Sequence, residues 1–383
     1  MAGVVTYYSY DLTTNTLLAT LPLTGVTFSQ RLNSSGSLSA TLNMADKLVQ
    51  KLDPQDATRP SRTLLVVDID TVIVWAGIIW TRKRVASSWQ VQIGANEVWS
   101  YFSRRLQWRD YTTNPGGTYW NTDPADAGYI AAELVVDVSK SPGSPFYNMG
   151  INVIEAFTNT NTITASYPLS SGATVDSMVN TLSAQGYLTG FDFAVDVSWS
   201  AGQGSTPSFS WNASYPRRGR VAGTTGLTLH ASFADYEWDE DGTKQANSIN
   251  ASASGAATLT TQAADANVQT AGYPLLEQRS TFTAINNQAA LQSAAQGQLA
   301  TIEWPVVTAL VNSPTFGDPF IGEYIMGDDV NLVIEPDWFF PSGLNCYLRI
   351  TGADHTIADQ GLSTTKFTLT NLLGLAPVSP PPL

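Results

Sequence analysis

Alternating apolar and polar residues predict β-strands over most of the first hundred positions. Around residue 40 every second side chain is apolar and its neighbours are serine, threonine or asparagine, so one strand face is expected to be buried and the other wet. Residues 64–75 predict a hairpin with a tight turn at Asp70, and residues 78–93 predict a second hairpin. Five or six strands joined by short turns are typical of a small barrel or sandwich. The apolar positions of the strand near residue 40 are Leu38, Ala40, Leu42 and Met44.

Helical spacing appears in the middle of the chain. A short helix capped by Asn96 is expected first, and Asp123 followed by Pro124 predicts the start of a longer helix. A further helix is predicted from its cap Thr174 to Gly186. Strands are predicted at 191–199, 208–215 and 227–233, so this part of the chain is an α+β unit. The apolar faces of the two longer helices are Ile130, Leu134 and Val138, and Val175, Met178, Val179 and Leu182.

The last third of the chain is predicted to return to strands. Residues 247–253 alternate weakly, and residues 252–269 indicate a mobile loop or an exposed hairpin. Thr283 is expected to cap a helix that ends before Pro305. The apolar seam of this helix is placed at Ile285, Ala289, Gln292, Gln296 and Leu299. A closing barrel is predicted from strands at 306–311, 323–326, 330–335, 346–351 and 365–371.

These elements predict an α+β fold that is mainly β, in which two small β-barrel domains are separated by an α+β insert. The expected division is an N-terminal barrel over 1–108, the insert over 109–234 and a second barrel with one long helix over 235–375. Residues 376–383 are rich in proline and predict a tail that forms neither helix nor strand.

Charge is scarce and its balance is acidic. Charged residues make up 13% of the 383 residues, and the formal net charge is −13. A protein that grips nucleic acid needs a basic track, and the sequence offers only the short clusters 82–84, 104–105 and 217–218. These clusters are interpreted as solvated strand ends or as interface partners for carboxylates. An acidic balance still permits a channel through which DNA slides without sticking.

No catalytic or metal-binding signature is found in the sequence. His230 and His355 are the only histidines, which argues against a histidine-based metal site. His230, Ser232 and Asp235 lie within six residues, whereas a serine triad draws its members from separate elements. Cys346 is the only cysteine, so it is expected to be a buried structural thiol. Neither an enzyme nor a bound cofactor is expected.

An acidic run near residue 238 allows several interpretations. Its spacing imitates the first half of a calcium loop, but the closing position is occupied by Ser248 instead of a carboxylate. Paired carboxylates can also hydrolyse glycans. An acidic strand end or loop is the favoured interpretation, and ion binding is left open. The members of the run are Asp235, Glu237, Asp239, Glu240 and Asp241.

Aromatic residues divide into two groups. Trp75, Trp80, Trp89 and Trp99 follow the strand pattern and are expected in the core or at an interface. Trp108, Tyr111, Tyr119 and Trp120 lie in a loop-like stretch and are better candidates for contact with a partner. This stretch supports the alternative function, a receptor- or glycan-binding module.

No targeting or membrane-spanning segment is predicted. Residues 1–12 lack the basic segment and apolar core of a signal peptide. The longest apolar run, residues 72–80, is too short to cross a bilayer. The protein is therefore expected to be made in a reducing cytoplasm.

The order of these pieces resembles the phage tail-hub family, also described as minor tail proteins or baseplate hubs of siphophage-like tails. The residues that carry the resemblance are Leu38-Ser39-Ala40-Thr41-Leu42, Asn247-Ser248-Ile249-Asn250-Ala251, the helix after Thr283, and Gly327-Asp328-Asp329-Val330 with the strands at 348–352 and 366–372 that follow it.

The resemblance implies two tube-type barrels per subunit and a homotrimeric ring that matches the sixfold tail tube with threefold symmetry. The implied location is the virion tail tip, and the implied partners are the distal tail or tail-tube protein, the tape measure protein and tail-tip or fibre proteins. DNA passes through such a ring without specific binding. Candidate interface residues are Arg104, Arg105, Trp108, Trp120, Arg217 and Arg218.

Overall fold

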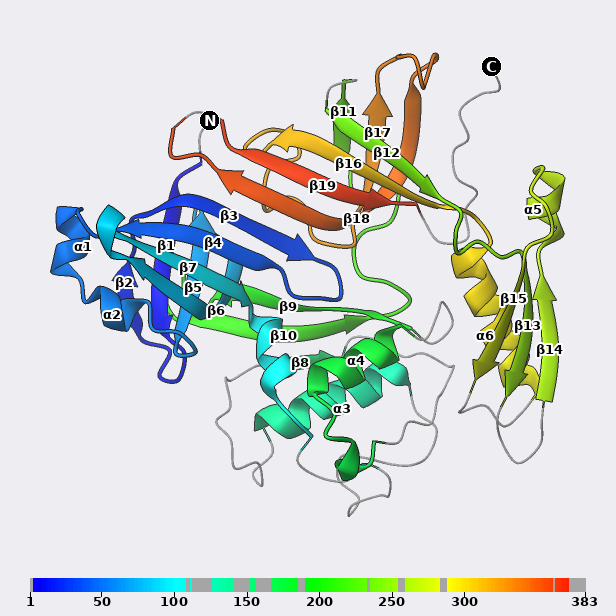
Figure 1. The fold of residues 1–383 in the computed structure, drawn as a ribbon, viewed down its shortest axis with the longest axis horizontal. Helices are drawn as coiled ribbons and strands as arrows, with labels where there is room; N and C mark the ends of the chain where they lie inside the picture. Colours follow the sequence, from blue (N-terminus) through cyan, green and yellow to red (C-terminus); the bar gives the residue numbers. More distant parts are fainter. Residues whose placement is uncertain are drawn as a thin grey trace.

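The structure is a computed structural model that describes residues 3–107, 111, 126–140, 152–155, 167–184, 190–232, 235–253, 259–282, 288–360 and 362–371. Its strands form one large sheet and two small three-stranded sheets (Figure 1). The α+β, mainly β class predicted from the sequence is confirmed.

The first half of the large sheet is formed by residues 5–97, which fold as strands around an apolar core. The strand near residue 40 has its predicted alternation, with Leu38, Ala40 and Leu42 buried. Two short helices, α1 (Lys47–Lys51) and α2 (Pro54–Ala57), lie beside these strands. The strands are β1 (Val5–Asp11), β2 (Leu17–Thr20), β3 (Leu23–Arg31), β4 (Ser37–Asn43), β5 (Thr63–Ile69), β6 (Val72–Val85) and β7 (Gln90–Glu97).

The second half of the large sheet is formed by strands from residues 228–370. Residues 323–326 form turns between Gly322 and Gly327, both of which have positive φ, so the predicted strand there is wrong. Tyr324 and Met326 are nevertheless buried in the core. The strands are β11 (Thr228–Ala231), β12 (Tyr236–Asp241), β16 (Val306–Pro314), β17 (Asp329–Ile334), β18 (Leu344–Ile357) and β19 (Thr364–Thr370).

Hydrogen bonds join these two sets of strands into one sheet. Its order is β12-β16-β19-β18-β3-β4-β7-β6-β5-β1-β2, and β17 and β11 branch from β18. The halves meet where β18 pairs with β3 in antiparallel register, from Gly352 opposite Arg31 to Ile357 opposite Val26. The described residues therefore form a continuous sheet across the chain instead of two separately closed barrels.

The middle of the chain packs helices against the first half. Its sheet contains β8 (Asn152–Glu155), β10 (Pro207–Ser214) and β9 (Asp192–Trp199), and its helices are α3 (Ala127–Lys140) and α4 (Val175–Ser183). Thr174 caps α4 as predicted, whereas the predicted start at 123–124 lies outside the described residues. The expected helix near 96 is a 3-10 helix, η2 (Val98–Arg104), which starts after Glu97. One apolar core joins these helices to the first half.

A small module projects from the second half (Figure 1). It consists of β13 (Ser248–Ala253), β14 (Leu259–Ala264), β15 (Glu277–Phe282), α5 (Ala266–Thr270) and α6 (Gln288–Ile302). Of the two predictions for residues 252–269, the hairpin agrees with the antiparallel β13–β14 pair. Leu299 is buried in the seam of α6 as predicted, whereas Ala289 and Gln296 are exposed and the helix buries Leu291 and Ala295 against the sheet. The predicted cap Thr283 and Ile285 lie outside the described residues.

Candidate functional site

Cross-strand register places polar side chains from eight neighbouring strands, β12 to β6, on one side of the sheet. Thr27 on β3 lies opposite Ser39 on β4 and opposite Thr356 on β18. Phe28 and Leu38, the next residues along β3 and β4, face the core on the other side of the sheet. We call this side the polar face. Its members include Glu237, Asp239, Thr308, Asn312, Lys366, Thr368, Asp354, Thr356, Thr27, Ser29, Ser37, Ser39, Gln92, Asn96, Thr81 and Lys83.

Arg31 and Lys366 on the polar face are neutralised, whereas Lys83 at its β6 end forms no ion pair among the described residues. The Arg31 guanidinium bonds to the Asp354 carboxylate at 2.5 Å, and Lys366 Nζ lies 2.8 Å from Glu237 Oε1. Asp239 adds a further carboxylate on the β12 side. Nucleic-acid phosphates bind tightly where unpaired cations of a protein displace their condensed counterions into solution. The polar face therefore offers a polyanion little electrostatic attraction.

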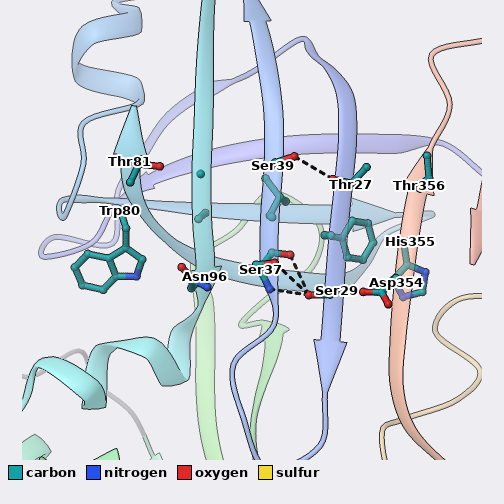
Figure 2. A pocket seen from close by; sticks show the side chains of 14 residues that line it. Thr27, Ser29, Ser37, Ser39, Trp80, Thr81, Asn96, Asp354, His355 and Thr356 are labelled. Atoms are coloured by element: carbon teal, nitrogen blue, oxygen red, sulfur yellow. Dashed lines mark hydrogen bonds between the residues drawn. The ribbon is translucent and has the colours of Figure 1, made fainter. Parts of the chain in front are cut away.

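A hollow of about 370 Å³ lies in the centre of the polar face, over β18, β3, β4, β7 and β6 (Figure 2). Hydroxyl groups line it and bond to one another: Thr27 Oγ1 lies 3.0 Å from Ser39 Oγ, and the Ser37 N–H donates to Ser29 Oγ at 2.8 Å. Trp80 closes one end, and its indole N–H donates to Ser100 at 2.8 Å. The hollow is thus lined largely by hydroxyls, several of which are already hydrogen-bonded to one another, and Asp354 on β18 is the charged residue in its lining.

His355 lies beneath the hollow, at the strand pair that joins the two halves. Its imidazole stacks on Phe28 with 4.6 Å between ring centroids, and its nitrogens bond to Thr365 Oγ1 at 2.9 Å and Gln30 Oε1 at 3.2 Å. Burial, reinforced by Arg31, lowers the pKa of His355 to about 3. The imidazole is therefore neutral at physiological pH, and its role is to hold the seam between the halves.

A second cavity, of about 280 Å³, lies where the first half, β9 and the second half meet. Glu97 lines it and accepts the Gly36 N–H at 2.6 Å. Burial raises the pKa of Glu97 to about 8, against the opposing effects of this N–H and of Arg31. Trp99 and Tyr324 line the same cavity.

Three arginine–aspartate pairs fasten the middle of the chain to the second half, and a fourth, Arg218–Asp196, lies within the middle. Asp192 on β9 joins all three parts, because it accepts from Arg349 on β18, from the Arg218 N–H at 2.7 Å and from Asn33 at 2.8 Å. Its carboxylate is buried, so these bonds are screened little by solvent. The other pairs are Arg217–Asp329 at 2.6 Å, Arg218–Asp196 at 2.5 Å and Arg220–Asp328 at 2.5 Å.

Comparison with known proteins finds similarity in structure only. No protein-family model and no curated protein sequence matches the chain. Prophage tail protein gp18 of Listeria monocytogenes is similar with a TM-score of 0.58 and 11% identity, covering 96% of this chain and 95% of that one. The 43 kDa tail protein of prophage MuSo2 from Shewanella oneidensis has a TM-score of 0.58 and 11% identity, with 97% of each chain covered. A chain of a PdpA–VgrG complex has a TM-score of 0.54 and 8% identity, covering 98% of this chain and 67% of that chain.

The chain has the fold of phage tail proteins. The resemblance drawn from the sequence is thereby confirmed for the fold. Identities of 8–14% in such comparisons carry no residue roles from one tail protein to another.

The tail-protein fold engages three of the predicted interface arginines inside the chain. Arg217 and Arg218 belong to the pairs described above, and buried Arg105 donates to the Val138 carbonyl at 3.0 Å. Arg104 is exposed, with its guanidinium 5.6 Å from the centre of the Trp80 ring. Trp108 and Trp120 lie outside the described residues. A contact of any of these six with a neighbouring subunit stays a prediction.

The acidic run of the sequence is an edge strand of the tail-protein fold. Residues 236–241 form β12, which pairs with β16, so the strand interpretation agrees with the structure. No group of three His, Cys, Asp or Glu residues suited to a metal ion occurs in the described ranges. Ser232 Oγ donates to Asp235 at 2.5 Å, and His230 is exposed on β11.

Asp192, Asp328, Asp329 and Arg349 are the important residues that sequence reasoning missed. Asp192 lies between Phe191 and Phe193, and an acidic residue inside an apolar strand was the available sign of a buried ion pair. Among the described helices, none combines the length and apolar character needed to cross a bilayer.

Proposed function

We propose that this protein is a structural tail hub: a homotrimeric ring at the distal end of a phage tail tube, with the polar face lining the DNA passage. The ring joins the tail tube to the tail tip. Its neighbours are the distal tail or tail-tube protein, the tape measure protein and tail-tip or fibre proteins. The protein acts in the virion and without enzymatic activity.

The polar face is the observation that carries this proposal. A passage for DNA has to hold water without binding phosphates, because each free cation would add a counterion-releasing contact and slow the moving strand. The face meets this need with hydroxyls and amides, and with Arg31 and Lys366 paired to carboxylates; among the described cations of the face, Lys83 at the β6 end stays unpaired. Its extension across both halves supplies the wide, continuous wall that a ring requires.

The fold supports the same proposal. The structures to which the chain is similar include prophage tail proteins from Listeria and Shewanella, with nearly complete coverage of both chains. The similar PdpA–VgrG complex supports a partner that docks on one side of the ring.

Electron cryomicroscopy of intact particles tests this function directly. We expect three copies around the central channel of the tail tip, with Thr27, Ser39 and Thr356 facing the lumen. Copies at the periphery of the tip, or a polar face turned away from the channel, would contradict it.

A receptor- or glycan-binding module is the second candidate function. Trp338, at the tip of the loop between β17 and β18, is 86% exposed, and an exposed indole is suited to stacking on a sugar ring. Glycan-array binding by the purified protein that disappears in Trp338→Ala would favour this function over the hub.

A further inference from the structure

The turn between β6 and β7 holds a tryptophan in the left-handed region of backbone conformation. Trp89 follows the 3-10 helix η1 (Ala86–Ser88) with a φ of +52° and a ψ of +41°. Bulky side chains rarely adopt this conformation, because their Cβ crowds the neighbouring carbonyl oxygen. Trp89 thus keeps a strained backbone at a position that suits glycine or asparagine. The other described non-glycine residues with positive φ are Asn15, Asn33, Ser61, Asp70 and Thr71, all of them smaller.

Contacts within the chain do little to offset this strain. The Trp89 side chain is 64% exposed, so burial of its indole contributes little to stability. Its N–H donates to the Ala86 carbonyl at 3.3 Å, and its carbonyl accepts the Met44 N–H at 2.8 Å, so the backbone is held in place. The sequence predicted Trp89 in the core or at an interface, and its exposure removes the core. Strained residues that persist in a fold are concentrated at functional sites.

Exposed cations lie on both sides of Trp89. Lys83 and Arg84 precede the turn on β6. The bond to Met44 brings α1 close as well, because the three residues from Met44 to Lys47 span at most about 11 Å. Figure 1 shows α1 beside the ends of β4 and β7. The exposed charged and apolar residues of α1 are Lys47, Lys51 and Leu48, and Leu48 is 62% exposed.

These residues form a surface that we call the basic tip. None of its four cations forms an ion pair within the described residues. The neighbouring Asp46 is engaged as the cap of α1, where it accepts the Leu48 N–H at 2.7 Å. The whole chain has only 19 lysines and arginines and a net charge of −13, so four unpaired cations around one exposed indole are a local concentration. The basic tip consists of Trp89, Leu48, Lys47, Lys51, Lys83 and Arg84.

The basic tip has the composition of a protein-binding anchor. Tryptophan and arginine are enriched among the residues that dominate binding energy at interfaces, and exposed cations steer an acidic partner into place. A membrane surface takes up a broad apolar helix face, whereas the large apolar side chains of the basic tip are Trp89 and Leu48. An acidic protein surface therefore fits the basic tip better than a bilayer does.

We infer that the basic tip inserts Trp89 into an apolar pocket, rimmed by carboxylates, on a different protein of the tail. The inference rests on the proposed function, because it requires the chain to lie within an assembled tail. A second copy of this chain fits less well: the hollow of the polar face is lined largely by hydroxyls, and Arg31 and Arg218 in the lining of the second cavity would repel the four cations. The strained turn fixes the direction of the indole before binding, which reduces the entropy lost on association.

Trp89→Gly separates the strain from the binding role. Glycine adopts a φ of +52° without crowding, so the urea midpoint of the purified protein should not fall. Loss of the indole should reduce incorporation of the protein into tails on the order of tenfold or more. Trp89→Asn, which also tolerates this conformation, should behave in the same way. A lower urea midpoint in Trp89→Gly, or normal incorporation of both variants, overturns the inference.

Leu362→Gly is the matched control. Leu362 is 68% exposed and lies between β18 and β19, so this variant also removes an exposed apolar side chain. Its incorporation into tails should equal that of the unaltered protein. An equal loss in Leu362→Gly and Trp89→Gly overturns a specific role of the indole.

The cationic part of the basic tip has its own test. Lys83→Gln with Arg84→Gln keeps the indole and removes two charges, so incorporation should fall on the order of threefold to tenfold. Vesicles that contain phosphatidylglycerol test the membrane as the occupant. Binding of the purified protein to such vesicles that disappears in Trp89→Gly would overturn the protein partner.

Photo-cross-linking in assembled particles identifies the occupant. With p-benzoylphenylalanine in place of Trp89, we expect a cross-link to one other tail protein, at a peptide with Asp or Glu beside apolar residues. The same group in place of Leu362 is the control. Cross-links to copies of this chain alone, or no more cross-linking than in the control, overturn the inference.

Electron cryomicroscopy of the same particles separates this inference from the proposed function. Three copies around the central channel without a cross-link from position 89 keep the hub and refute the docking of the basic tip. A cross-link to another tail protein from copies at the periphery keeps the docking and refutes the hub.

Discussion

Asp192→Ala should be among the most destabilising substitutions in this protein. The Asp192 carboxylate is 7% exposed and accepts from the Arg349 guanidinium, from the Arg218 N–H and from Asn33. Alanine leaves the Arg349 charge, whose side chain is 12% exposed, without its partner. Removal of one member of a buried pair costs about 3–5 kcal/mol, because the remaining charge stays desolvated. We therefore expect the free energy of unfolding to fall by about this amount.

Urea denaturation followed by both tryptophan fluorescence and circular dichroism measures this loss and checks that one transition is observed. Asp354→Ala is the matched control: its pair with Arg31 is as short, at 2.5 Å, but the two side chains are 48% and 35% exposed. An exposed pair contributes less than about 1 kcal/mol. Asp192→Asn combined with Arg349→Met removes both charges and keeps one of the two neutral hydrogen bonds, because Asn33 and the Arg218 N–H donate to different oxygens of Asp192; part of the loss should therefore be recovered. Equal effects of Asp192→Ala and Asp354→Ala would refute the reasoning.

Three further predictions concern titration and the polar face. Folding lowers the pKa of His355 from 6.5 to about 3, so between these pH values the unfolded chain binds one more proton than the folded chain. The free energy of unfolding should therefore drop as pH falls from 6.5 toward 3. His355→Gln should flatten this part of the stability–pH curve, and an unchanged slope would contradict the prediction. Folding raises the pKa of Glu97 from 4.5 to about 8, so the contribution of its protonated side chain to stability is lost as pH rises through this range. Above pH 8, Glu97→Gln should therefore be more stable than the unaltered protein. Denaturation at pH 6 and pH 9 measures the difference. Thr27→Lys with Ser39→Lys adds two cations to the polar face and should slow DNA release from assembled particles. Thr27→Gln with Ser39→Gln adds bulk without charge and should leave the rate unchanged. Equal rates for the two double variants would argue against the polar face as the lining of the channel.

The spacing of apolar and polar residues correctly predicted those helices and strands whose buried side depends only on neighbouring residues in the chain. The alternation in β4 and the Thr174 cap are examples, because each depends on residues within one strand or one turn. The seam of α6 was placed only in part: Leu299 lies in it, but Ala289 and Gln296 are exposed, and the sheet contacts Leu291 and Ala295. The turns at 323–326 show the same limit: two glycines with positive φ override a short apolar run.

Long-range pairing could not be read from the sequence. The β18–β3 seam joins residues more than 300 positions apart, such as Arg31 and Asp354, and no local spacing encodes that register. The arginines at 217 and 218 were expected to meet carboxylates, and they do so within the chain: Arg217 contacts Asp329 from 112 positions away. Residue type predicted the kind of partner, and the fold decided which carboxylate it is.

Scarce charge makes the position of each charge informative. With 13% charged residues, the chain places buried pairs at the junction of its parts and paired cations on the polar face. The runs of like charge that lack such partners lie at the two ends of the eight-stranded sheet, acidic at β12 and basic at the end of β6. Solubility alone would be served by mixed charges at each edge. The centre of the polar face, where Arg31 is paired with Asp354, is the part of this charge distribution on which the proposed passage for DNA depends.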